Sequence, residues 1–78
     1  MREEYNIVID WADDYGLELQ EQSYEKDSMA WKIVGGNPRL VGINDLKERL
    51  WDIEWELNFD EHAFAFTIYD YYLDGLIR

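Results

Sequence analysis

Aromatic side chains are the feature that most constrains the fold of this 78-residue chain. The sequence contains four tryptophans, six tyrosines and three phenylalanines, and 47% of its residues are hydrophobic. Such a composition is the opposite of that of a disordered chain, because it supplies enough apolar surface to build a core. The length allows one domain, so we expect residues 1–78 to fold around a single core.

The charge balance of the chain is strongly acidic. Eighteen Asp and Glu residues against seven Lys and Arg give a formal net charge of −11. Because this charge repels phosphates, we expect neither direct binding to nucleic acid nor docking on an anionic membrane. The chain has no cysteine, and no apolar run approaches the roughly 20 residues of a membrane span. The N-terminal residues lack a signal-peptide core, so we expect a cytoplasmic protein.

Residues 3–15 are predicted to form a helix. Apolar residues recur at helical spacing on one face, namely Tyr5, Val8, Ile9, Ala12 and Tyr15. Gly16 suits the left-handed conformation that commonly ends a helix. An alternation of apolar residues leaves a strand over 5–11 as the alternative, but the helical period covers more residues.

Residues 17–43 are predicted to form a small antiparallel meander. Met29, Trp31 and Ile33 alternate with less apolar neighbours, which is typical of a half-buried strand. Polar residues at 25–28 suit a turn, and the Gly and Pro residues at 35–38 break the chain. Apolar residues within 40–43 offer a short third strand.

Two further helices are predicted, over 45–57 and 61–74. Asn44 and Asp60 are the expected N-caps, because their side-chain oxygens can accept hydrogen bonds from free N–H groups of the first turn. An apolar stripe at helical spacing supports the first of these helices: Leu46, Leu50, Ile53 and Leu57. The order helix, antiparallel hairpin or three-stranded sheet, helix, helix defines a small α+β domain.

Candidate catalytic and metal-binding residues form no pattern that supports an enzyme. His62 is the single histidine and has no evident partner to orient it as a general base. A calcium loop starting at Asp10 fails, because its third and sixth positions are Ala12 and Tyr15. The glycine pair at 35–36 lacks the pattern of a phosphate-binding loop. We therefore expect no enzyme activity, no metal and no cofactor.

Rows of carboxylates on the predicted helices point instead to a binding protein. The rows are Glu3, Asp10 and Asp14 on the first helix and Asp45, Asp52 and Glu56 on the second. Carboxylates four residues apart on a helix lie about 6 Å apart along its axis, which resembles the charge pattern of a nucleic-acid backbone. The alternative is that these faces are solvated and serve only solubility.

Tryptophans form a second apolar side on the helix predicted over 45–57. Trp51 and Trp55 lie roughly 140–180° around that helix from the leucine stripe, at 100° per residue. One interpretation is that both pack internally against the third helix. The other is that one of them is exposed and anchors a partner or a second copy of the chain, because tryptophan is a typical anchor of protein interfaces.

Small size, acidity, absence of cysteine and the predicted order of elements make the chain similar to small phage-encoded inhibitors. These include some anti-CRISPR proteins, which block the nucleic-acid groove of a Cas effector, and anti-restriction proteins that mimic DNA. The resemblance covers the whole chain in composition and element order, but it transfers no functional residue. It implies an inhibitor that binds a basic groove stoichiometrically.

The leading hypothesis is therefore an acidic inhibitor that occupies a basic, nucleic-acid-binding groove of a partner protein. Its binding residues would be the six carboxylates named above together with Trp51 and Trp55. The alternative is a small structural or regulatory module that forms a homodimer through an aromatic helix face, with no mimicry.

Overall fold

The computed structural model describes residues 3–25, 28–51 and 55–69 and confirms the predicted α+β class. Within these ranges two helices and a short 3₁₀ helix accompany a four-stranded antiparallel sheet. The elements, in chain order, are α1 (Glu3–Asp14), β1 (Glu18–Glu25), β2 (Ser28–Gly35), the 3₁₀ helix η1 (Pro38–Leu40), α2 (Ile43–Arg49), β3 (Glu56–Asp60) and β4 (Ala65–Tyr69).

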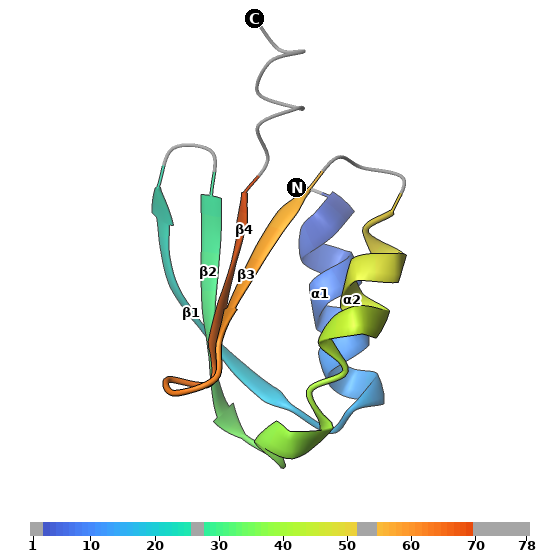
Figure 1. Cartoon of the computed structure of the whole chain (residues 1–78), viewed down its shortest axis with the longest axis vertical. Coiled ribbons are helices and arrows are strands. Elements are labelled where there is room, and N and C mark those ends of the chain that lie inside the picture. The colour runs from blue at the N-terminus through green and yellow to red at the C-terminus, as the bar shows by residue number, and fades with distance from the viewer. Residues whose placement is uncertain (1–2, 26–27, 52–54, 70–78) are drawn as a thin grey trace, which may run out of the picture.

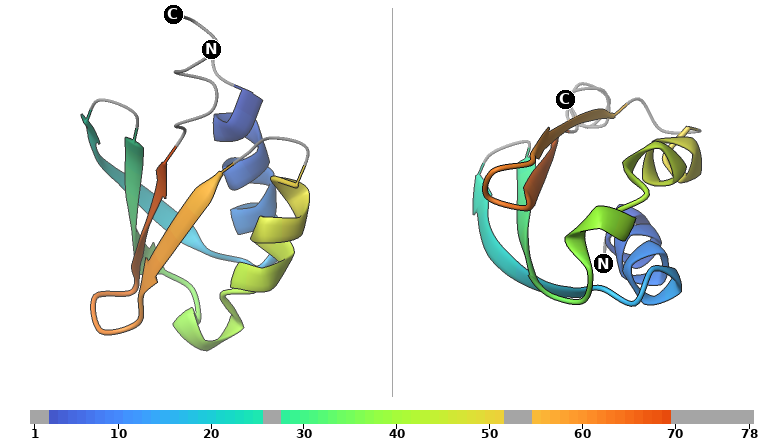
Figure 2. Two further views of the ribbon diagram at one scale, coloured as in Figure 1. Left: turned by 45° about the horizontal axis from the view of Figure 1, so that its top comes forward. Right: turned by 60° about the horizontal axis from the view of Figure 1, so that its bottom comes forward.

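The fold has two layers, with both helices on one face of the sheet (Figure 1). The strand order is β1-β2-β4-β3, and every neighbouring pair is antiparallel. The helices run side by side in opposite directions, as Figures 1 and 2 show. No described element covers the other face of the sheet (Figure 2), which we call the outer sheet face.

Aromatic rings from three elements form the centre of the core. Trp31 on β2 is paired in register with Phe66 on β4, and their rings stack with centroids 5.3 Å apart. The Trp11 ring from α1 meets the Phe66 ring edge-on at 5.5 Å. All three side chains are buried, so these two tryptophans and one phenylalanine join the helix layer to the sheet.

The helix predicted over 3–15 is confirmed as α1. Val8, Trp11 and Ala12 are buried at helical spacing, as an amphipathic helix on a sheet requires. Gly16 has a φ of 66°, and the Leu17 N–H donates to the Ala12 carbonyl at 2.8 Å. This bond is typical of a helix that ends at a left-handed glycine. The alternative of a strand over 5–11 is wrong.

The predicted hairpin is confirmed as β1 and β2, but the short third strand over 40–43 is wrong. Pro38 begins the 3₁₀ helix, and the Asn37 side chain accepts a hydrogen bond from the Arg39 N–H at 3.0 Å. Proline suits this position because it has a fixed φ and needs no donor there. Ile43 already belongs to α2.

The helix predicted over 45–57 is shorter than expected and begins earlier. It runs over Ile43–Arg49, and Gly42 rather than Asn44 is its N-cap. Leu46 and Leu50 are buried as the leucine stripe predicts, but Leu57 belongs to β3. Residues 52–54 lie outside the described residues. Strand pairing with β4 therefore outweighs the helical spacing of the apolar residues beyond Leu50.

The helix predicted over 61–74 is wrong within the described residues, because β4 occupies Ala65–Tyr69. The Asp60 side chain does accept hydrogen bonds from the N–H groups of His62 and Ala63, at 3.0 and 3.3 Å. Those bonds are the ones expected of an N-cap, but they close the turn of a β3–β4 hairpin. Residues 70–74 lie outside the described residues.

Candidate functional site

Five carboxylates lie at exposed or half-buried positions of the two helices, and one of them, Asp13, borders the start of β1. We call this surface the acidic helix face: Asp10, Asp13 and Asp14 on α1, and Asp45 and Glu48 on α2. On both helices these positions are set off from the buried apolar residues by the helical period. All are exposed except Asp45, which is half-buried, so the face is open to a partner.

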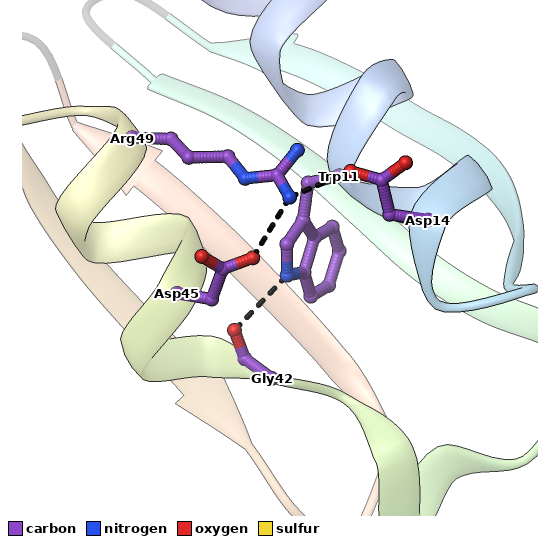
Figure 3. Close-up of polar contacts among 5 residues, drawn as sticks. All are labelled: Trp11, Asp14, Gly42, Asp45 and Arg49. Carbon is purple, nitrogen blue, oxygen red and sulfur yellow. Dashed lines mark hydrogen bonds and ion pairs between the residues drawn. The ribbon is translucent and has the colours of Figure 1, made fainter.

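Arg49 joins the two halves of the acidic helix face (Figure 3). Its guanidinium lies 2.6 Å from the Asp14 carboxylate on α1 and 3.0 Å from the Asp45 carboxylate one turn earlier on α2. The hydrogen bond that Arg49 donates to Asp14, followed by the one it donates to Asp45, raises the pKa of Arg49 above its ordinary value. When Arg49 and the exposed Lys47 of α2 are counted against the five carboxylates, these seven residues carry a net charge of −3.

Gly42 fixes the spacing of the helices beneath this face. The indole N–H of Trp11 donates to the Gly42 carbonyl at 3.0 Å (Figure 3). The Leu46 N–H donates to the same oxygen at 3.1 Å. The Tyr15 ring lies against the Gly42 backbone, where a Cβ atom would collide with it. Position 42 must therefore lack a side chain for α1 and α2 to approach this closely.

The sequence-predicted acidic residues separate into three groups in the structure. Asp10, Asp14 and Asp45 come together on the acidic helix face. Glu56 is exposed at the start of β3, where it lines a small pocket with Lys47 and Trp51. Its expected place beside Asp45 on one helix is wrong. The Glu3 side chain and residue 52 (Asp52) lie outside what the structure describes.

The two predicted aromatic anchors also separate. Trp51 lies two residues after the end of α2 and is 82% exposed, which agrees with the interpretation that one tryptophan faces solvent. Trp55 is half-buried and packs against the core. The expected packing of these side chains against a third helix is not found, because the described part of that segment is strand β4.

Two acidic residues were missed as candidates, although the sequence carries the signal for both. Asp13 lies one residue before Asp14 on the solvent side of α1, and Glu48 precedes Arg49 on α2. The spacing of Asp45 and Arg49 is that of an i, i+4 ion pair, which holds an acidic and a basic side chain on one helix face. Only the approach of α1 to α2, which the sequence does not reveal, adds Asp14 to this pair.

The chemistry available on the acidic helix face is electrostatic. No cluster of three or more histidine, aspartate and glutamate side chains suited to a metal ion occurs in the part of the chain that the structure describes. Within the same ranges, no helix is both long and apolar enough to cross a membrane. The acidic helix face therefore presents a group of closely spaced carboxylates, two of which pair with Arg49.

Comparison with known proteins finds no relative. No family model matches the chain, and neither a curated protein nor a solved structure is significantly similar to it. Fold and surface together define a small α+β protein with an acidic helix layer. Its function must be inferred from the geometry and charge of that layer.

Proposed function

We propose that this protein is a non-catalytic acidic inhibitor that occupies a basic, nucleic-acid-binding groove of another protein. The observation that carries the proposal is the acidic helix face, on which carboxylates of two adjacent helices form one negatively charged surface. A groove that binds phosphates is lined by lysine and arginine, and such cations would pair with these carboxylates instead. Inhibition would then be competition for the groove, with no bond made or broken.

The Arg49 bridge supports this proposal because it prearranges part of the charge. Asp14 and Asp45 are held at 2.6 and 3.0 Å from one guanidinium, so their side chains have lost rotational freedom before a partner arrives. Ordering a long or mobile side chain at an interface costs about 0.5–1.5 kcal/mol, which a prearranged carboxylate avoids in part. Asp10 and Asp13 have no ion pair within the described ranges and remain free to bind cations.

The net charge of −11 supports fast and selective association with a basic partner. Complementary charge raises association rates and disfavours partners of the same sign. Trp51 would add apolar contact at the edge of the helix layer, since an exposed indole is a frequent interface anchor. Two identical chains of this charge repel each other, which favours a basic partner over a second copy.

The test is affinity capture with a charge variant that leaves the Arg49 bridge intact. Immobilised protein is exposed to bacterial lysate at low salt, and bound proteins are eluted with rising salt. The Asp10→Asn, Asp13→Asn double variant should lose most of a stoichiometrically bound nucleic-acid-handling protein. Asp14 is left unchanged, because its removal would also break the bond to Arg49.

The matched control is the Glu18→Gln, Glu56→Gln double variant. It also removes two charges, from exposed positions on β1 and β3 that are not among the five carboxylates of the acidic helix face. The immobilised control should still retain the partner, and the partner should elute from it at slightly lower salt. Equal loss in both variants would mean that net charge alone drives binding, which would contradict a defined site.

The homodimer alternative has one observation in its favour, the 82% exposure of Trp51. Sedimentation equilibrium distinguishes the homodimer from the groove-binding inhibitor. The proposal expects a monomer in both the unchanged protein and the Trp51→Ala variant. A dimer that dissociates in Trp51→Ala would favour the homodimer and leave the carboxylates as solubilising groups.

A further inference from the structure

A pocket of about 800 Å³ lies at the end of the molecule where η1 and the start of α2 meet the β3–β4 turn. Its lining includes none of the five carboxylates of the acidic helix face. Its volume is within the range of about 300–1,000 Å³ that is typical of sites for small organic ligands. The pocket brings together segments that are about 20 residues apart in the chain.

Three of the four polar side chains that line this pocket can donate hydrogen bonds, and the fourth is the Glu61 carboxylate. Arg39, Asn44 and His62 all line it. Within the described ranges, the Arg39 guanidinium has no ion pair or hydrogen-bond partner, although its backbone N–H is bound by Asn37. Arginine, asparagine and histidine can each donate to an anionic oxygen, and histidine does so in either protonation state. The pocket therefore offers free donors to a negatively charged group.

The remaining walls are apolar and include two aromatic rings. Phe59, Phe64, Val41 and Ile43 line the pocket beside the donors. Phe64 is 43% exposed and has a φ of 48°, a left-handed conformation that a bulky side chain rarely adopts. The Phe64 carbonyl accepts a hydrogen bond from the Ile33 N–H at 2.8 Å, which helps to hold this backbone in place. Strained residues of this kind concentrate at binding sites.

We propose that this pocket binds a small organic monoanion, with an aromatic carboxylate as the ligand class. The carboxylate would accept charge-assisted hydrogen bonds from the Arg39 guanidinium, with Asn44 and His62 as further donors. The flat apolar body would lie against Phe59 and Phe64. A single negative charge fits better than a phosphate dianion, because the chain carries a net charge of −11.

Glu61 gives this proposal a test of opposite sign. Its side chain is exposed and also lines the pocket, so its charge opposes an anionic ligand. Removing that charge should tighten binding, whereas removing the Arg39 charge should weaken it. If the pocket bound its ligand by apolar contact alone, neither substitution would change the affinity.

The experiment is a titration of the ¹⁵N-labelled 78-residue chain with 2-naphthoate, in which amide chemical shifts are followed. Saturable shifts are expected at residues 39–44 and 59–64. The uncharged isostere 2-naphthamide should bind at least about tenfold more weakly, since one charge-assisted contact is lost. Arg39→Gln should weaken naphthoate binding about tenfold, and Glu61→Gln should tighten it about two- to threefold.

Lys32→Gln is the matched control, because Lys32 is an exposed cation on β2 that does not line the pocket. It should leave naphthoate binding unchanged apart from a small effect of net charge. The proposal is overturned if naphthoate causes no saturable shift, or if the shifts lie outside the two segments. Equal affinity for naphthamide, or equal weakening by Arg39→Gln and Lys32→Gln, would overturn it as well.

Discussion

Single residues at the junction of α1 and α2 set the geometry of the acidic helix face. Trp11 donates to the Gly42 carbonyl, Tyr15 packs on the Gly42 backbone, and Arg49 spans from α2 to Asp14. None of these contacts is evident from spacing in the sequence, because each joins residues more than 25 positions apart. Their consequences can be measured one residue at a time.

Gly42→Ala should destabilise the protein far more than Gly16→Ala. Both glycines have a positive φ, 59° and 66°, so alanine adds about 1–2 kcal/mol of backbone strain at either position. At Gly42 the new Cβ also collides with the Tyr15 ring, whereas at Gly16 it meets nothing within 4 Å. Overpacking costs a further 1–3 kcal/mol, roughly. Urea unfolding of both variants measures the difference, and equal losses would contradict the contact.

Ionisation of the Tyr15 phenol should make the protein less stable above about pH 10. Burial of the phenol, and next the charge of Asp45, raise the pKa of Tyr15 above its ordinary value of 10.0. The folded state therefore holds the proton more tightly than the unfolded state does. The resulting contribution to the free energy of unfolding is complete below pH 10. It is lost as the pH rises from 10 through the folded-state pKa of Tyr15. Urea unfolding at several pH values should show a shallower decline in Tyr15→Phe, and an unchanged decline would refute this assignment.

At the scale of elements, the sequence predicts α1 and the β1–β2 hairpin correctly but misassigns the second half of the chain. The reason is visible at Asp60, which has the residue type and the hydrogen bonds of a helix N-cap. Phe66 and Ile68 alternate with Ala65 and Thr67 as in a strand, yet Phe64 and Ile68 are spaced four residues apart as on one face of a helix. Residues 65–69 form a strand because they pair with β2 and β3. Such pairing joins segments far apart in the sequence, so the local pattern does not reveal it.

The candidate site was predicted in part for the same reason. Asp10 and Asp14 follow from the helical period of α1, and that helix is the part of the chain where local pattern and tertiary structure agree. Glu56 was placed on the wrong surface, because a strand replaces the end of the predicted helix. The ligand pocket depends on the turn between β3 and β4, so no local pattern could have revealed it.

Asp60→Ala should weaken the β3–β4 hairpin. The Asp60 carboxylate accepts hydrogen bonds from the N–H groups of His62 and Ala63, and the alanine variant leaves both donors to water. The expected loss is about 1 kcal/mol of unfolding free energy. Asn58→Ala, also exposed on β3, should change stability by less than about 0.5 kcal/mol. Indistinguishable unfolding curves for the two variants would exclude the capping role.

For the whole molecule, charge repulsion should limit stability. A net charge of −11 on 78 residues opposes compaction, and screening shortens its range from about 30 Å at 0.01 M salt to about 3 Å at 1 M. We expect sodium chloride to raise Tm, although it also weakens the Arg49 ion pairs. Circular dichroism melts at increasing salt measure this, and a Tm that stays constant or falls would contradict it. Salt should raise the Tm of the Asp10→Asn, Asp13→Asn variant by less than that of the unchanged protein.

The central claim is that the acidic helix face takes the place of nucleic acid on a partner. It is tested most directly by competition, with a fluorescent oligonucleotide bound to the captured partner and its anisotropy followed as this protein is added. The unchanged protein and the Glu18→Gln, Glu56→Gln control should displace the oligonucleotide at similar concentrations, while Asp10→Asn, Asp13→Asn should need at least about tenfold more. A partner that binds protein and oligonucleotide together, or equal displacement by all three proteins, would contradict the claim.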